Sequence, residues 1–415
     1  MPTVQVTVTL SIPEGSIALE ALEEEIAQVV EAAGRQLLLR ACKAMEAAHL
    51  QRQAASLRRD KQRPLDLLTR FGWVRLMRWQ VRGPDGGYHR PLDELVGLHS
   101  HQHASPWITS QAVALATRLP YRQAAHLLSN ILQTPIDHRS LYGWVCRAGV
   151  KVVVDEDERH QAVFTHGQLP PADPRQREIV LAEVDGTFLR AQREEAPEFE
   201  VRLGVLTSGK ALESLTAKHR RYRLLERVRY GGVESAGDFG ERLFLAGEAR
   251  LGLSRAQHLL LVGDGADWIE ALAGHDRWRA TYQLDWWHLG RALHRTFPDH
   301  PQLRRRLQTA LYAGDGQHLI RLVRLAQSAG RGDPQRLATL LTYLQTNQGG
   351  FYGARSLRPR LSEQAQLVCL EGSGAVEKHI DLAICRRFKG QGMRWSRAGA
   401  NRLLKLRLRE LDAAA

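Results

Sequence analysis

Three segments in the second half of the chain constrain its fold more than any other feature. Residues 178–192, "EIVLAEVDGTFLRAQ", are apolar on both faces of an extended strand, which is typical of a central strand in a covered sheet. Residues 257–273 and 280–297 each have the pattern of an apolar strand, a turn and a helix. This order of elements predicts an α/β domain with helices packed on a sheet.

The rest of the sequence divides around this sheet. Residues 17–60 have helical composition, 67–92 suggest a hairpin with the turn "GPDGG", and 155–177 are polar enough to form a linker. Residues 199–209 and 212–224 are expected to be further strands, 237–250 a helix, and Ser396 the N-cap of a last helix. We expect five regions: a helix and small hairpin (1–105), a helical region (106–160), the first part of the sheet domain (176–299), a helical insertion (300–365) and a C-terminal pair of helices (366–415).

Two predicted helices in the second region are separated by a short break. The segments "PYRQAAHLLSNIL" and "DHRSLYGWVCRAG" flank "QTPI", and Asp137 is the expected N-cap of the second helix. This spacing is that of a DNA-binding helix-turn-helix, although any helical hairpin can have it.

Composition indicates a polyanionic partner. The 415 residues carry a formal net charge of +13, and residues 377–412 alone hold ten basic residues against four acidic ones. Nucleic acid is the first expectation, and a merely solvated helix face is the alternative. No run of about 18 apolar residues occurs, the N-terminus lacks the pattern of a signal peptide, and the four cysteines form no CxxC pair. The chain is therefore expected in the cytoplasm.

Three carboxylates stand at positions where chemistry is expected. Asp185 in "LAEVDGT" and Asp264 in "LVGDGAD" each end an apolar strand, where an open sheet collects its ligands. Either aspartate alone has a simpler interpretation as a turn or N-cap residue. Glu377 falls inside the apolar stripe of the helix "GSGAVEKHIDLAICRRF", where an uncompensated charge is costly. Mg²⁺ or Mn²⁺, which prefer oxygen ligands, would compensate three such acids.

Such a site predicts phosphodiester chemistry. Two divalent ions about 3.5–4 Å apart can activate an attacking oxygen and stabilise a leaving one. Water as the attacker gives strand cleavage, and a DNA 3′-hydroxyl gives strand joining.

The motifs "VDGT", "GDGADWI", "LDWWHLGRAL" and "GSGAVEKHIDLAICRRFKGQGMRWSRAGANRLLKLR" together resemble DDE transposases of bacterial insertion sequences. The most similar groups are the ISLre-type and ISKra-type enzymes, which are distantly similar to Mutator-like enzymes, and the resemblance covers roughly residues 60–410. It implies an RNase H-like catalytic domain with a mixed sheet and a large helical insertion, in which Asp185, Asp264 and Glu377 are the catalytic acids that bind two Mg²⁺ ions. It also implies accessory roles for Asp285 and His288, for which a helix cap and a half-buried histidine are the alternatives.

The resemblance further implies what the protein binds. The partners would be double-stranded DNA, namely the terminal inverted repeats of the element and the target, held by a homodimer or higher oligomer in the bacterial nucleoid. A basic outer face on the Glu377 helix, to which His379 is also assigned, is expected to meet phosphates. The residues expected to contact DNA are Lys378, Arg386, Arg387, Lys389 and Arg394.

Other functions stay open on the sequence alone. The same acids would serve an RNase H-like nuclease or resolvase without strand joining, or the chain is a retired transposase that only binds DNA. Aromatic residues can stack on unpaired bases, and of Trp286 and Trp287 one is expected to face DNA. Core packing is the expectation for Trp268 and Trp395.

Overall fold

The computed structural model describes residues 3–12, 15–99, 102–215, 220–366, 370 and 372–413. The chain forms two compact units, Met1–Ala148 and Gly149–Ala415, with the division inside one long helix. No helix in the described ranges combines the length and apolarity needed to cross a membrane.

The first unit joins a long helix to a small antiparallel sheet. Its order is α1 (Leu19–Arg52), β1 (Arg58–Thr69), β2 (Gly72–Arg82), β3 (Tyr88–His89), α2 (Pro91–Val96), α3 (Pro106–Ala116), α4 (Tyr121–Leu132) and the start of α5 (His138–Phe164). Helix α1 packs on β1 and β2 through Leu38, Leu39 and Cys42. The predicted hairpin is present, because β2 and β3 pair antiparallel across "GPDGG". A second and tighter turn just before Gly72 joins β1 to β2, which the sequence did not predict. The Gly72 φ of +88° allows this tighter turn.

The predicted helix pair is also present. Helices α4 and α5 follow each other closely, and Asp137 Oδ2 accepts a hydrogen bond from the Arg139 amide at 2.9 Å, as expected of a cap. The predicted linker at 155–177 begins too early, because α5 continues to Phe164. Its polar residues are held there by partners within the second unit: Glu156 pairs with Lys405, and His160 with Glu241.

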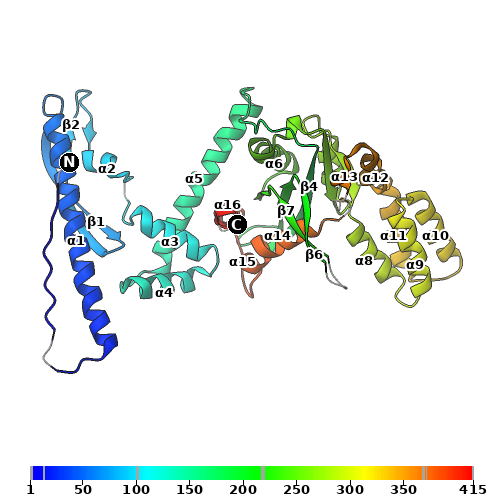
Figure 1. The fold of residues 1–415 in the computed structure, drawn as a ribbon, viewed down its shortest axis with the longest axis horizontal. Coiled ribbons are helices and arrows are strands. Elements are labelled where there is room, and N and C mark those ends of the chain that lie inside the picture. The colour runs from blue at the N-terminus through cyan, green and yellow to red at the C-terminus, as the bar shows by residue number, and fades with distance from the viewer. Residues whose placement is uncertain are drawn as a thin grey trace. The chain divides into compact units, whose positions relative to one another are not determined.

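A mixed five-stranded sheet organises the second unit, in the order β10-β9-β4-β5-β8 (Figure 1). Strands β4, β9 and β10 are parallel, whereas β5 is antiparallel to both β4 and β8. The bounds are β4 (Ile179–Arg190), β5 (Glu198–Thr207), β8 (Val228–Gly232), β9 (His258–Gly263) and β10 (Thr281–Leu284), with a separate hairpin of β6 (Gly209–Leu215) and β7 (Arg220–Leu225).

Helices cover both faces of this sheet. Helix α6 (Ala236–Leu251) and helix α7 (Asp267–Gly274) pack against the face that carries Val180, Ala182 and Val184. The opposite face carries Ile179 and Leu181 and packs against the segment around α12 (Gly353–Leu357). Since side chains alternate along a strand, Glu183 and Asp185 belong to this second face.

The predicted helical insertion lies beyond β10 (Figure 1). It contains α8 (Trp286–Thr296), α9 (Pro301–Tyr312), α10 (Gly316–Ser328), α11 (Pro334–Thr346), α12 and α13 (Glu363–Gln366). The chain then returns to the sheet with α14 (Gly374–Ile380), a π-helical turn at Asp381–Cys385, α15 (Arg386–Phe388) and α16 (Arg397–Ala413). Ser396 Oγ accepts a hydrogen bond from the Gly399 amide at the start of α16, as predicted.

Candidate active site

Three aspartates stand at one level of the sheet because their strands are parallel neighbours. The pairing of β4 with β9 runs in register to Glu183 and Val262. Two residues further along each strand come Asp185 and Asp264. Asp285 follows β10 and donates its amide to the Gly263 carbonyl at 2.8 Å, which places it beside Asp264. Asp264 and Asp285 follow the carboxyl ends of β9 and β10. The prediction that Asp185 ends its strand was wrong, because β4 continues to Arg190 through its pairing with β5.

Asp185 is held in an environment that disfavours its charge. Burial, with the negative charge of Asp264, raises the pKa of Asp185 to about 6, and Glu377 adds to the effect. A hydrogen bond from the Gly186 amide, at 2.7 Å, and the neighbouring His288 oppose the rise. Among the described residues, neither Asp185 nor Asp264 forms an ion pair with Lys or Arg.

A tight turn positions Asp264. Its Oδ1 accepts a hydrogen bond from the Ala266 amide at 3.1 Å, and Gly265 has a φ of +97°. A Cβ at Gly265 would lie 2.7 Å from Asn347 Oδ1, so this position requires glycine. The Tyr343 hydroxyl donates to the Asp264 carbonyl at 2.5 Å and ties the turn to α11.

Asp285 is fully buried and caps α8. Its carboxylate accepts hydrogen bonds from the Trp287 amide at 3.0 Å and the Ser373 hydroxyl at 2.5 Å, and its Oδ2 lies 2.7 Å from His288 Nδ1. Burial would raise the pKa of Asp285, but these hydrogen bonds outweigh it and hold the pKa below the usual value. Asp285 therefore caps α8, as its simpler interpretation predicted, and its carboxylate also contacts His288.

His288 connects this buried carboxylate to Glu377. Its Nε2 lies 3.3 Å from Glu377 Oε1, so the imidazole lies between two acids. The Asp285 hydrogen bond raises the pKa of His288, and Glu377 and Asp185 add to the rise. Burial in turn raises the pKa of Glu377, opposed by His288. Glu377 is half-buried at the inner side of α14, as the apolar stripe predicted.

Glu183 has a different role from its neighbour Asp185. It is 1% exposed, its Oε1 lies 2.6 Å from Lys210 Nζ, and its Oε2 accepts hydrogen bonds from the amides of Ala375 and Val376 at 2.8 and 3.0 Å. A carboxylate at a helix N-terminus satisfies free amides and the helix dipole. Glu183 thus fixes α14 on β4. The sequence predicted that Glu183 and Asp185 share one face of a strand. It did not predict the ion pair of Glu183 with Lys210 on β6.

The basic residues expected on the outer face separate into two groups. Arg387 is 2% exposed and His379 is 4% exposed. The predicted DNA contact of Arg387 and the assignment of His379 to the outer face were therefore wrong. The Arg387 guanidinium lies 5.2 Å from the centre of the Trp395 ring, and burial lowers the pKa of His379 to about 4, so His379 is neutral. The π-helical turn at Asp381–Cys385 rotates the following residues relative to a regular helix. Of the residues expected to contact DNA, the exposed ones are Lys378, Arg386, Lys389 and Arg394.

A groove of about 610 Å³ opens beside Glu377. Arg223, Arg227 and Lys378 line it together with Trp287. Trp287 is 48% exposed, with the Arg291 guanidinium 4.6 Å from its ring centre, while Trp286 packs against the core. The groove therefore combines positive charge with an exposed aromatic face next to the acids.

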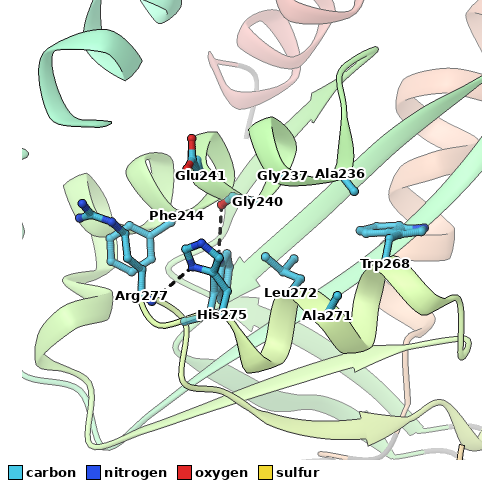
Figure 2. Close-up of a pocket in the computed structure, with 11 residues that line it drawn as sticks. Ala236, Gly237, Gly240, Glu241, Phe244, Trp268, Ala271, Leu272, His275 and Arg277 are labelled. Carbon is cyan, nitrogen blue, oxygen red and sulfur yellow. Dashed lines mark hydrogen bonds between the residues drawn. The ribbon is translucent and has the colours of Figure 1, made fainter. Parts of the chain in front are cut away.

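Two other features lie away from these acids. A cavity of about 160 Å³ between α6 and α7 is lined mostly by apolar residues such as Phe244, Trp268 and Leu272 (Figure 2). Within the described part of the chain, one set of three potential metal ligands has all its ligand atoms within 4.8 Å of one another: His160, Asp238 and Glu241. The three acids Asp185, Asp264 and Glu377 do not form such a set, so their carboxylate oxygens do not all lie within 4.8 Å of one another.

Comparisons with known proteins place the chain in a family. The model of an uncharacterised protein family, UPF0236, matches residues 13–414. A protein of Streptococcus gallolyticus, described as "UPF0236 protein in vanSb 3'region", is 22% identical over 343 residues, which are 81% of this chain and 70% of that protein. A solved structure, the "Drosophila P element transposase strand transfer complex", is 13% identical and covers 74% of this chain and 78% of its own, with a TM-score of 0.22. A TM-score this low does not establish a shared fold. Because the family model spans nearly all of the sequence, the chain belongs to the UPF0236 family.

Proposed function

We propose that this protein is a DNA transposase of the DDE type that cleaves DNA strands and transfers them with the help of divalent metal ions. The observation that carries the proposal is the meeting of Asp185 and Asp264 on adjacent parallel strands, with Glu377 close enough to raise the pKa of Asp185. The chain would then be a member of the ISLre-type or ISKra-type group and would act on DNA in the bacterial nucleoid.

The sheet topology supports an RNase H-like catalytic domain. The first strand of the unit, β4, lies in the middle, with an antiparallel pair on one side and two parallel strands on the other. This is the strand order expected of that domain. The helices between Asp264 and Glu377 correspond to the insertion that such transposases carry.

The acids fit divalent metal ions. The donors are carboxylate oxygens, which Mg²⁺ and Mn²⁺ prefer, and no Lys or Arg pairs with Asp185 or Asp264 within the described ranges. Their wider spacing suits two ions better than one. Mg²⁺ held by Asp185, Asp264 and Glu377 would activate the attacking oxygen of water or of a DNA 3′-hydroxyl and stabilise the leaving oxygen.

The surrounding residues would orient this site and hold DNA. Asp285 fixes the imidazole of His288, which in turn positions the carboxylate of Glu377. In the groove, Arg223 and Lys378 would neutralise phosphates near the cut, and Trp287 offers a face on which a base can stack. Helices α4 and α5 would bind the terminal repeats of the element.

The test is a cleavage assay on DNA from the ends of the element, with Mg²⁺. Asp185→Asn and Glu377→Gln should each abolish cleavage, whereas Asp299→Asn, a change of an exposed acid far along the chain, should retain it. Full activity of either variant would contradict the assignment. Strand-transfer products would be formed by a transposase but not by a nuclease or resolvase. DNA binding without cleavage of any substrate would favour a retired transposase.

A further inference from the structure

Helix α1 has two apolar faces, and one of them has no partner within the described first unit. Leu19, Ile26, Val30 and Leu37 are between 40% and 70% exposed. At about 100° per residue these four lie within about 40° of one another. The opposite side of the helix carries Cys42, Glu46 and Leu50, which are buried where α1 packs on the sheet.

These four exposed residues belong to a continuous apolar stripe whose other members are half-buried. Its members recur every three or four residues along the helix, which is the period of a buried face. Large side chains occupy the first part and alanines the last part. The stripe consists of Leu19, Leu22, Ile26, Val30, Ala33, Leu37, Ala41, Ala44 and Ala48.

The first half of α1 is only partly packed, with residues such as Leu22 and Val29 half-buried. The buried residues of the helix begin at Gly34, so the segment 19–33 buries no side chain fully. Isolated helices of about 12–15 residues are marginal in water, and most helices in proteins are stabilised by packing. A partner on the stripe would supply that packing.

Charge identifies the partner. The segment 19–33 carries five glutamates and no basic residue, whereas 35–52 carries Arg35, Arg40, Lys43 and Arg52 against the single buried Glu46. A second copy of α1 running antiparallel places the acidic half of each helix against the basic half of the other. A parallel copy would instead bring like charges together.

We propose that α1 is the dimerisation helix of this protein and pairs antiparallel with α1 of a second copy. The side-chain sizes match this arrangement. In the register that puts Val30 opposite Leu37 of the second copy, Leu19 lies opposite an alanine at position 48 and Ile26 opposite one at position 41. Large residues thus meet small ones toward the ends of a helix pair about 50 Å long, and Val30 meets Leu37 near its centre. The contact is the same from both sides, as a two-fold dimer requires.

This interface goes beyond the proposed function and does not depend on it. A protein that joins two DNA ends needs two copies, but α1 would pair in the same way if the acids catalysed nothing. Failure of the cleavage assay and failure of dimerisation are therefore separate outcomes.

Light scattering on the full chain at physiological salt tests the interface. The wild type should have twice the chain mass of 46.7 kDa. Val30→Asp combined with Leu37→Asp should halve the mass, and the circular dichroism should lose no more than the helical signal of segment 19–33. Gln28→Asp is the matched control, because Gln28 is exposed on the side of α1 away from the stripe, and it should remain a dimer. A monomeric wild type, or a dimer that survives the double substitution, would overturn the proposal.

A charge exchange tests the antiparallel direction. One variant carries Glu20→Lys, Glu23→Lys, Glu24→Lys and Glu25→Lys, and the other carries Arg40→Glu, Lys43→Glu and Arg52→Glu. Each should be monomeric alone because its two halves now carry the same sign, and an equal mixture should form dimers of one copy of each. Dimers of either variant alone would refute the antiparallel pairing.

Discussion

The imidazole of His288 lies with Nε2 3.3 Å from Glu377 Oε1, while its Nδ1 lies 2.7 Å from the buried carboxylate of Asp285. A histidine held on one side by a buried acid presents a fixed orientation to the group on its other side. This relationship connects β10 to α14 across a long insertion in the sequence.

His288→Asn should lower DNA cleavage about 10–100-fold and raise the Mg²⁺ concentration needed for half-maximal activity, because Glu377 loses the group that orients it. Titration of cleavage against Mg²⁺ measures both effects. His294→Asn, an exposed change on the same helix, is the control. An unchanged Mg²⁺ dependence in His288→Asn would refute the positioning role.

Asp185→Asn should stabilise the metal-free protein although it abolishes catalysis. The pKa of Asp185 is raised to about 6 in the folded state, so its carboxylate penalises folding above pH 6 and the penalty disappears below the ordinary value near 4. Asparagine removes the charge and keeps an oxygen for the Gly186 amide. Urea unfolding with EDTA at pH 7.5 should show a gain of up to about 3 kcal/mol. A loss of stability would contradict the charge argument.

Mg²⁺ should raise the melting temperature at pH 7.5 and lose this effect as the pH falls through 6. A cation must displace the proton of Asp185, so each pH unit below 6 should lower the apparent affinity about tenfold. Thermal unfolding at several pH values, with and without Mg²⁺, measures the shift. Asp185→Asn should show little shift at any pH, and an equal shift at pH 5 in the wild type would be inconsistent with a proton at this site.

Lys210→Met should destabilise the protein by about 3–5 kcal/mol, because it leaves the charge of Glu183 buried without its partner. Adding Glu183→Gln should restore much of the loss, since the amide oxygen of Gln can still accept from the amide groups of α14. Urea unfolding of both single variants and the double variant measures the coupling. If Glu183→Gln alone weakened Mg²⁺ binding without loss of stability, Glu183 would be a ligand instead.

Arg223→Ala and Lys378→Ala should each weaken DNA binding and lower the slope of log affinity against log salt by about 1, as expected when one phosphate contact is lost. Fluorescence anisotropy over a range of salt concentrations measures the slope. Arg324→Ala, an exposed change on α10, is the control for the loss of one positive charge. A slope that stays unchanged in both groove variants would place the DNA elsewhere.

Local patterns in the sequence gave correct predictions where neighbouring residues decide the outcome. Strand β4 is apolar on both faces and is central in the sheet, and Asp137 and Ser396 cap their helices. The end of α5 was predicted wrongly because its polar residues are held by partners far along the chain, such as Lys405. Arg387 was expected to contact DNA because of its charge, although a regular helical period places it in the apolar stripe with Val376, Ile380 and Ala383.

The sequence by itself determined that two aspartates follow apolar runs and that one glutamate interrupts an apolar helix face, because neighbouring residues form these patterns. Only the tertiary structure decided that Asp185 and Asp264 are neighbours, that Glu183 secures α14, and that His288 reaches Glu377. Strand register and the return of α14 to the sheet depend on packing between segments more than 75 residues apart in the chain, and no local pattern records such packing.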